Sequence, residues 1–175
     1  MCKVFFQKFS PRLVMSLIFL VCATGIGYAL YSQIIDGAEP CPLCIAQRIA
    51  YFLIGIIALI GAIHGPKKCG NYIYGFLITL LSGAGVAMAH HHVYLQSLPP
   101  EQWPMSCGMP LEILFKQMPL TGFIHTVLSG TAECAMIDWT ILGISGPKVS
   151  MYGFILLTIA GLYILIQQTT KKVNA

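Results

Sequence analysis

Charged residues are scarce in this sequence. Lys, Arg, Asp and Glu together make up 9% of the 175 residues, whereas soluble domains carry about 25%. Hydrophobic residues make up 57%. These values exclude an ordinary water-soluble fold and predict an integral membrane protein of one compact domain. The chain has no internal repeat and no low-complexity segment, and we expect no nucleic-acid partner.

Four long stretches almost without charge predict membrane spans. A helix needs about 20 apolar residues to cross a bilayer, where water cannot satisfy the backbone. The spans are predicted at about residues 13–35, 45–63, 72–93 and 149–166. Small residues recur along them, which favours close helix packing. The prediction is an all-α four-helix membrane bundle formed by residues 1–175. The first span lacks a clear cleavage site, so we expect it to be retained rather than removed as a signal peptide.

Basic residues lie mostly on one side of the predicted membrane. If the chain crosses four times, seven of them share one side: Lys3, Lys8, Arg12, Lys67, Lys68, Lys171 and Lys172. The positive-inside rule then places both termini in the cytoplasm. All six acidic residues fall outside, in two loops at about residues 36–44 and 94–148.

The longer outer loop contains an amphipathic pattern. Leu111, Leu114, Phe115 and Met118 follow the i, i+3, i+4, i+7 spacing of one helix face. We predict a short helix there, which either lies on the membrane surface or packs on the bundle.

The topology sorts the seven cysteines into two groups. Cys41, Cys44, Cys107 and Cys134 fall outside, where disulfides persist. Cys2 and Cys69 fall in the cytoplasm, and Cys22 lies in the middle of the first span, where it suits a small packing residue. The expectation is two outer pairs and three free thiols.

The Cys41–Cys44 pair favours redox chemistry. Its loop is too short for a disulfide to stabilise much, and Cys-x-x-Cys pairs recur where dithiols are made and broken. Pro42 suits the first turn of a helix, so Cys44 lies near the positive N-terminus of the second span. Arg48 follows Cys44 by four residues, on the same helix face, and further favours a thiolate.

Other interpretations stay open on these residues alone. A bridge between Cys107 and Cys134, across 26 intervening residues, can simply brace the long loop. All four outer cysteines can bind zinc, although Cys107 and Cys134 lack the usual spacing, and we expect no metal. Arg48 can extend to the headgroups without any further role.

The motifs resemble the DsbB family of membrane quinone-linked oxidoreductases. The resemblance covers nearly the whole chain and rests on "EPCPLCIAQR" (39–48), "HHHVYLQ" (90–96), "SCGMPLEIL" (106–114) and "SGTAECAMIDWTILG" (129–143). It implies a four-helix bundle in the bacterial inner membrane, with periplasmic cysteines. It also implies ubiquinone or menaquinone as cofactor, drawn from the membrane quinone pool, and a DsbA-like thioredoxin-fold partner in the periplasm.

The resemblance implies a role for each matching residue. Cys41 and Cys44 would exchange electrons with the quinone, with Cys44 as the thiolate facing the ring, and Arg48 would help to bind the quinone. Cys107 and Cys134 would react with the soluble partner, Cys107 forming the mixed disulfide. His92, which precedes "VYLQ", best matches the family's histidine near the quinone, although the three consecutive histidines also suit a solvated interfacial patch.

Two departures from the family pattern accompany the match. The dithiol insert is Pro42-Leu43, without the aromatic residue that often lies there, and "GPKVS" at the start of the fourth span carries no tryptophan. Two further functions remain alternatives. One is an oxidase of this type for a single specialised partner, and the other is a metal-binding or structural membrane protein braced by disulfides.

Overall fold

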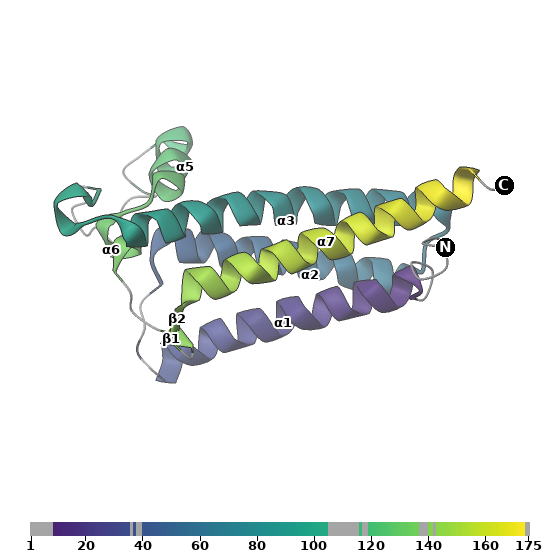
Figure 1. Cartoon of the computed structure of the whole chain (residues 1–175), viewed down its shortest axis with the longest axis horizontal. Helices are drawn as coiled ribbons and strands as arrows, with labels where there is room; N and C mark the ends of the chain where they lie inside the picture. Colours follow the sequence, from purple (N-terminus) through teal and green to yellow (C-terminus); the bar gives the residue numbers. More distant parts are fainter. Residues whose placement is uncertain are drawn as a thin grey trace.

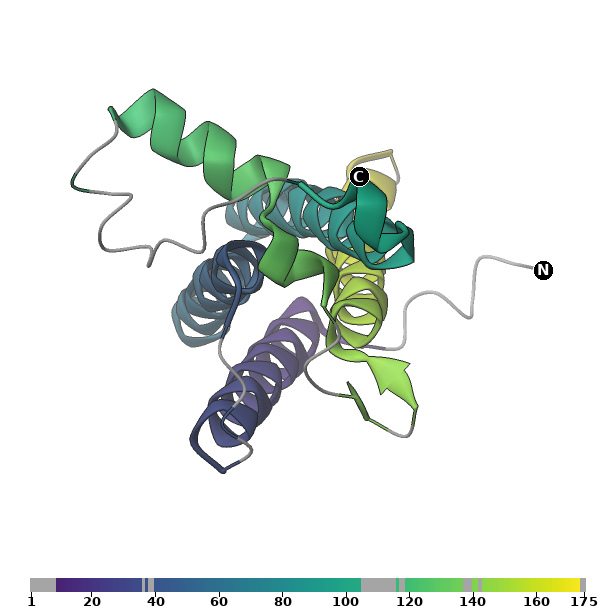
Figure 2. The same ribbon diagram turned by 90° about the vertical axis from the view of Figure 1, so that its left-hand side faces the viewer.

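Four long helices lie side by side along the long axis of the molecule (Figure 1). The computed structural model describes residues 9–35, 37, 40–104, 116, 119–136, 140–141 and 143–173. The four helices are α1 (Pro11–Ile35), α2 (Pro42–His64), α3 (Lys68–Ser97) and α7 (Gly146–Val173). Seen end-on they surround a common core (Figure 2), and α1 begins at the end of the bundle where α7 ends.

All four helices are long and apolar enough to cross a membrane. The predicted all-α four-helix fold is therefore confirmed. Each helix extends beyond the stretch predicted as its span; α3, for example, covers Lys68–Ser97 rather than 72–93. Backbone hydrogen bonding continues a helix into polar surroundings, whereas hydropathy detects only the part that suits lipid.

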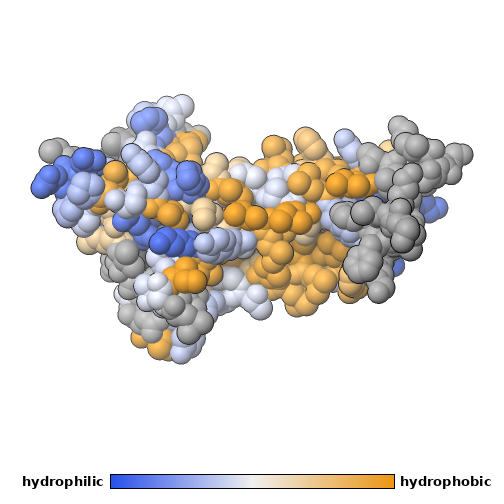
Figure 3. Space-filling model, viewed as in Figure 1, coloured by the Kyte–Doolittle hydropathy of each residue, from blue (hydrophilic) through white to orange (hydrophobic). Residues whose placement is uncertain are grey.

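The bundle interior is filled by side chains from all four helices. The largest cluster of buried apolar residues consists of Met15, Ile18, Cys22, Ala50, Ile54, Ala58, Ile78, Ala89, Phe154, Leu157 and Ile164. Many large apolar side chains are instead exposed on the outside of the helices. Figure 3 shows this hydrophobic surface over the bundle, with hydrophilic residues gathered at the end that carries the loops. Such a surface is suited to lipid.

Small residues bring α3 and α7 into close contact. A Cβ added at Gly85 would overlap the ring of Phe154, which is itself fully buried. One turn away, the Thr158 hydroxyl donates a hydrogen bond of 3.0 Å to Ser82 Oγ. Close approach at small residues and hydrogen bonds between polar side chains are the usual means of helix association in membranes.

Arg12 closes the far end of the bundle, away from the loops. Its guanidinium donates to the carbonyl oxygens of Ala62 and Ile63, at the C-terminus of α2. Gly65 ends that helix in the left-handed conformation, with φ 54° and ψ 52°. A cation at these carbonyls satisfies acceptors that the helix leaves without partners and complements its dipole.

The opposite end carries the short elements of the long loop. These are η2 (Pro100–Gln102), α5 (Leu120–Ser129), α6 (Ala132–Ala135) and the antiparallel strands β1 (Thr140–Ile141) and β2 (Ile144–Ser145). In the register, Thr140 pairs with Ser145 and Ile141 with Ile144. The helix predicted over residues 111–118 lies outside the described residues except for Lys116.

The contact at Gly85 generates a test of the packing. We expect Gly85→Ala to destabilise the bundle by about 1–3 kcal/mol, because the added methyl forces the Phe154 ring aside. Gly83→Ala is the matched control, since nothing lies within 4 Å of its added Cβ. Unfolding midpoints of the two variants in detergent measure the difference, and equal midpoints would contradict the close α3–α7 contact.

Candidate active site

The dithiol lies at the first turn of α2. Cys41 is the N-cap residue, with φ −66° and ψ 163°, and Pro42 occupies the first helical position. The main-chain N–H of Cys44 donates to Cys41 Sγ over 3.4 Å. Cys41 is buried and Cys44 half-buried. The sulfur of Cys41 thus replaces the hydroxyl or carboxylate oxygen that usually caps a helix.

A third cysteine, Cys134, reaches the same point from the long loop. It lies on the single turn of α6 and is fully buried, in an apolar cluster with Cys41, Leu43 and Leu95. The chain enters this turn through Gly130, which is buried and has φ 79°. A Cβ at Gly130 would overlap Leu95, so glycine is required both by the conformation and by the packing.

His92 of α3 completes the cluster. It is 2% exposed, and its Nε2 lies 3.7 Å from Cys41 Sγ. Its Nδ1 lies 3.2 Å from the amide nitrogen of Gln47 on α2. The sulfurs of Cys41 and Cys134 and a ring nitrogen of His92 all lie within 4.8 Å of one another. Two thiols and one imidazole therefore form a buried cluster.

The two sulfurs of this cluster influence each other's ionisation. A hydrogen bond with Cys41 lowers the pKa of the Cys134 thiol to about 6, with further help from the main chain of Thr131 and Leu43. The same hydrogen bond, with Cys41 as donor, raises the pKa of Cys41. The pair therefore holds one negative charge on Cys134, beside a neutral Cys41 sulfur. Thiol–disulfide exchange requires a thiolate beside a disulfide sulfur, so this position of Cys134 suits an attack once Cys41 belongs to a disulfide.

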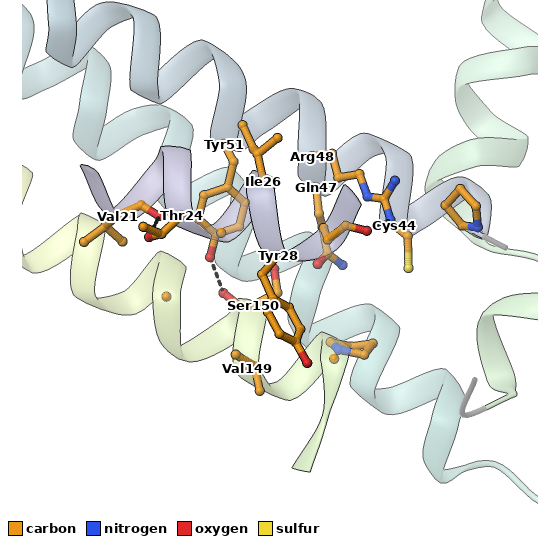
Figure 4. Close-up of a pocket in the computed structure, with 16 residues that line it drawn as sticks. Val21, Thr24, Ile26, Tyr28, Cys44, Gln47, Arg48, Tyr51, Val149 and Ser150 are labelled. Carbon is orange, nitrogen blue, oxygen red and sulfur yellow. Dashed lines mark hydrogen bonds between the residues drawn. The ribbon is translucent and has the colours of Figure 1, made fainter. Parts of the chain in front are cut away.

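Cys44 packs against this cluster and also lines an apolar pocket of about 350 Å³. The pocket lies between α1, α2 and α7. Figure 4 shows Cys44, Gln47, Arg48 and Tyr51 of α2 along one side, with Val149 and Ser150 of α7 on the other. The Tyr51 hydroxyl donates to the Ser150 carbonyl over 3.0 Å, and its ring stacks on Phe154. This volume lies within the range of small-molecule sites, about 300–1,000 Å³.

Arg48 lines the same pocket and is anchored to α1. Its guanidinium donates to Gln33 Oε1 over 2.6 Å and to the Ala29 carbonyl over 3.1 Å. These two bonds use only part of the five N–H groups of the side chain. Arg48 also acts electrostatically on Cys44, one turn earlier on the helix. Arg48 therefore connects α2 to α1 and also places a positive charge near the sulfur of Cys44.

Five of the six predicted site residues fall at this end of the bundle. Cys41 meets Cys134 and His92, while Cys44 and Arg48 line the pocket. His92 is not among the residues that line the pocket, and its ring faces Cys41 instead. Cys107 lies outside the described residues. Every cysteine that the structure describes is a free thiol.

Several residues of the site were not predicted from the sequence. Gln47 contacts His92, Gln33 holds Arg48, and Gly130 positions Cys134. Gln47 carried a usable signal, since a polar side chain three residues after Cys44 interrupts an apolar run on the same helix face. Nothing comparable distinguishes Gln33, which lies at the polar end of its helix.

His91 and His90 face away from the cluster. His91 Nε2 lies 3.0 Å from the carbonyl oxygen of Ser129, at the end of α5, and His90 is exposed. The three consecutive histidines thus diverge around α3, because successive helical residues point about 100° apart.

Four helices long and apolar enough to cross a membrane, with three thiols gathered at one end beside a pocket, are the arrangement expected of a membrane thiol–disulfide oxidoreductase. Residues 11–164 match the family model described as "Disulfide bond formation protein DsbB". The chain therefore belongs to the DsbB family, whose function is disulfide bond formation.

Individual relatives agree with this assignment and extend over nearly the whole chain. The chain is 38% identical to the disulfide bond formation protein B of Marinobacter nauticus, over 93% of this chain and 96% of that protein. The identity is 42% to the protein of the same name from Stutzerimonas stutzeri, over 91% and 97%. It is also 42% to the protein of this name from Acinetobacter baumannii, over 95% and 100%.

The position of Gly130 generates a test of how Cys134 is held. In a Cys44→Ser, Cys107→Ser background, mild oxidation will join Cys41 to Cys134, because their sulfurs already lie within 4.8 Å. Adding Gly130→Ala will slow this step at least about fivefold, the effect of a displacement costing about 1 kcal/mol.

Gly143→Ala is the matched control for that experiment. Gly143 also has a positive φ, 81°, but an added Cβ meets nothing within 4 Å. Both substitutions place an alanine at a positive φ, but only Gly130→Ala adds the overlap with Leu95. Mass spectrometry of the cross-linked peptides follows the rate, and equal rates in the two variants would show that Gly130 does not set the position of Cys134.

Proposed function

We propose that this protein oxidises the thiols of a DsbA-like periplasmic thioredoxin-fold protein and passes the electrons to ubiquinone or menaquinone. One observation carries the proposal: the Cys-x-x-Cys pair connects the thiol cluster with the pocket. Cys41 lies against Cys134, and Cys44, which also packs against that cluster, lines the pocket between α1, α2 and α7. A dithiol arranged in this way can receive electrons on one side and release them on the other.

The pocket suits a quinone headgroup. Its walls are mostly apolar, it lies between helices that face lipid, and Arg48 supplies N–H donors suited to a carbonyl oxygen. Arg48 and Cys44 would hold the headgroup, with Tyr51 and Val149 as part of the wall. A bound quinone supplies a two-electron, two-proton acceptor.

The chain's own residues support the exchange that delivers electrons to Cys44. Attack of the Cys134 thiolate on Cys41 breaks the Cys41–Cys44 disulfide, forms a Cys41–Cys134 disulfide and leaves an electron pair on Cys44. The new thiolate lies at the N-terminus of α2, one turn before Arg48, and both favour its negative charge. The leaving group is therefore stabilised at the edge of the pocket.

Cys107 would react with the soluble partner. In the family pattern it pairs with Cys134 and is attacked by a thiolate of the soluble partner. That attack forms a mixed disulfide at Cys107 and frees Cys134 for the step above. We further propose that the loops carrying these cysteines face the periplasm and that both termini lie in the cytoplasm of a bacterium, as the distribution of basic residues favours.

A purified assay tests the proposal. Reduced thioredoxin-fold donor and a soluble quinone are mixed with the protein in detergent, and quinone reduction is followed by absorbance. We expect Cys44→Ser and Cys41→Ser each to lower the rate to the uncatalysed background, because the exchange lacks a sulfur. Cys69→Ser is the control, since Cys69 is an exposed thiol at the other end of the bundle. Full quinone reduction by Cys44→Ser would contradict the proposal.

Arg48 is tested by separating quinone binding from turnover. Loss of a hydrogen bond to a charged group removes about 1.5–3 kcal/mol, so we expect Arg48→Ala to raise the KM for quinone about 10-fold or more. Arg48→Lys keeps the charge but lacks the planar guanidinium. Its KM for quinone should lie between those of the unsubstituted protein and Arg48→Ala. An unchanged KM in Arg48→Ala, with an unchanged unfolding midpoint, would leave Arg48 only its contacts with Gln33 and Ala29.

A further inference from the structure

The cluster of Cys41, His92 and Cys134 has the composition of a metal site. We infer that the fully reduced protein binds one thiophilic divalent d¹⁰ ion, of which Zn²⁺ is the representative, through Cys41 Sγ, Cys134 Sγ and a ring nitrogen of His92. Metal binding itself does not depend on the proposed function, whereas its effect on thiol exchange rests on that function. It differs from the four-cysteine zinc site that the sequence left open, because the third ligand is a histidine from another helix.

The distances suit a tetrahedral ion. Zinc binds sulfur at about 2.3 Å and imidazole nitrogen at about 2.0 Å, so a sulfur and a nitrogen ligand lie about 3.5 Å apart. Cys41 Sγ and His92 Nε2 are 3.7 Å apart, and the three donor atoms are mutually within 4.8 Å. Binding therefore needs only small side-chain rotations. Three protein ligands leave one position for an exchangeable fourth ligand.

The charge balance suits a buried site. Cys41 is 4% exposed, His92 2% and Cys134 0%, and Leu43 and Leu95 lie in the same cluster. An isolated charge is costly in such surroundings. Two thiolates neutralise a divalent cation, and the imidazole binds without adding charge. Starting from the Cys134 thiolate and the Cys41 thiol, the balance is one ion in and one thiol proton out, with no change of oxidation state.

Gln47 provides the support that a ligating histidine needs. Its side-chain amide lies 3.2 Å from His92 Nδ1, whereas Nε2 is the ring nitrogen that lies 3.7 Å from Cys41 Sγ. With its oxygen turned to that position, the amide accepts the Nδ1 proton and leaves the Nε2 lone pair directed at Cys41. Metal-bound histidines usually make such a bond with their second nitrogen.

The site exists only in the reduced protein. A Cys41–Cys44 disulfide, or any disulfide at Cys134, removes a thiolate ligand. The ion also holds both sulfurs that exchange with each other, so a bound metal stops that exchange until it dissociates. The cluster thus has a second activity: it is a redox-dependent metal site that reversibly arrests its own enzyme.

Cadmium titration of the reduced, full-length protein tests the inference, because cadmium–thiolate bonds absorb in the near ultraviolet. The protein is reduced in detergent, and the reductant is removed anaerobically before titration. We expect one ion per chain to bind, Zn²⁺ to displace it, and oxidised protein to show no band. His92→Ala should weaken binding by more than about 10-fold, and Cys41→Ser with Cys134→Ser should abolish it.

His90→Ala and Cys69→Ser are the matched controls, since both residues are exposed and of the same types as the ligands. Both should bind cadmium like the unsubstituted protein. Equal affinity in His92→Ala and His90→Ala would overturn the inference, as would a band that survives in Cys41→Ser with Cys134→Ser. His92→Gln keeps a polar side chain at this buried position and replaces His92→Ala if that variant fails to fold.

Discussion

The site depends on the way Cys41 caps α2. An N-cap residue keeps an extended backbone, while the residues that follow turn into the helix. Cys41 therefore lies against α3 and α6, whereas Cys44, at the first turn, packs against this cluster and also lines the pocket between α1, α2 and α7. A single helix start thus connects a thiol cluster with a pocket between helices, and Pro42 supports this arrangement because its φ suits the first turn.

Among the described residues of the long loop, Cys134 reaches the thiol cluster. Gly130 allows the chain to pass beneath Leu95 and Leu43, and α6 then places Cys134 in the apolar cluster. Because both residues are buried, electrostatic effects between the sulfurs of Cys134 and Cys41 are stronger than in solvent. His91 adds a second connection between α3 and the end of α5.

Much of the fold and part of the site followed from the sequence, because they depend on local patterns. Apolar runs of the right length predicted the four helices, and the four-residue spacing of Cys44 and Arg48 placed both on one face of α2. The pairing of His92 with Gln47 did not follow, because it depends on the rotation of α3 against α2, which small residues such as Ala89 permit but do not specify. The helix α5 was missed because a run of 10 residues after Pro119 is too short to stand out in an apolar chain.

The helix α1 packs closely on α2 but touches α7 much less, and the pocket lies along this loosely packed side. A lipid-soluble ligand that enters between α1 and α7 would reach the pocket from the lipid or detergent that covers these apolar helices. Its effective concentration is then the mole fraction in the lipid or detergent phase, and diluting the whole sample in buffer leaves that fraction nearly constant. The affinity of this protein for a lipid-soluble ligand should therefore be expressed as a mole fraction of ligand in the lipid or detergent. Preparations with different detergent contents are comparable only on that scale.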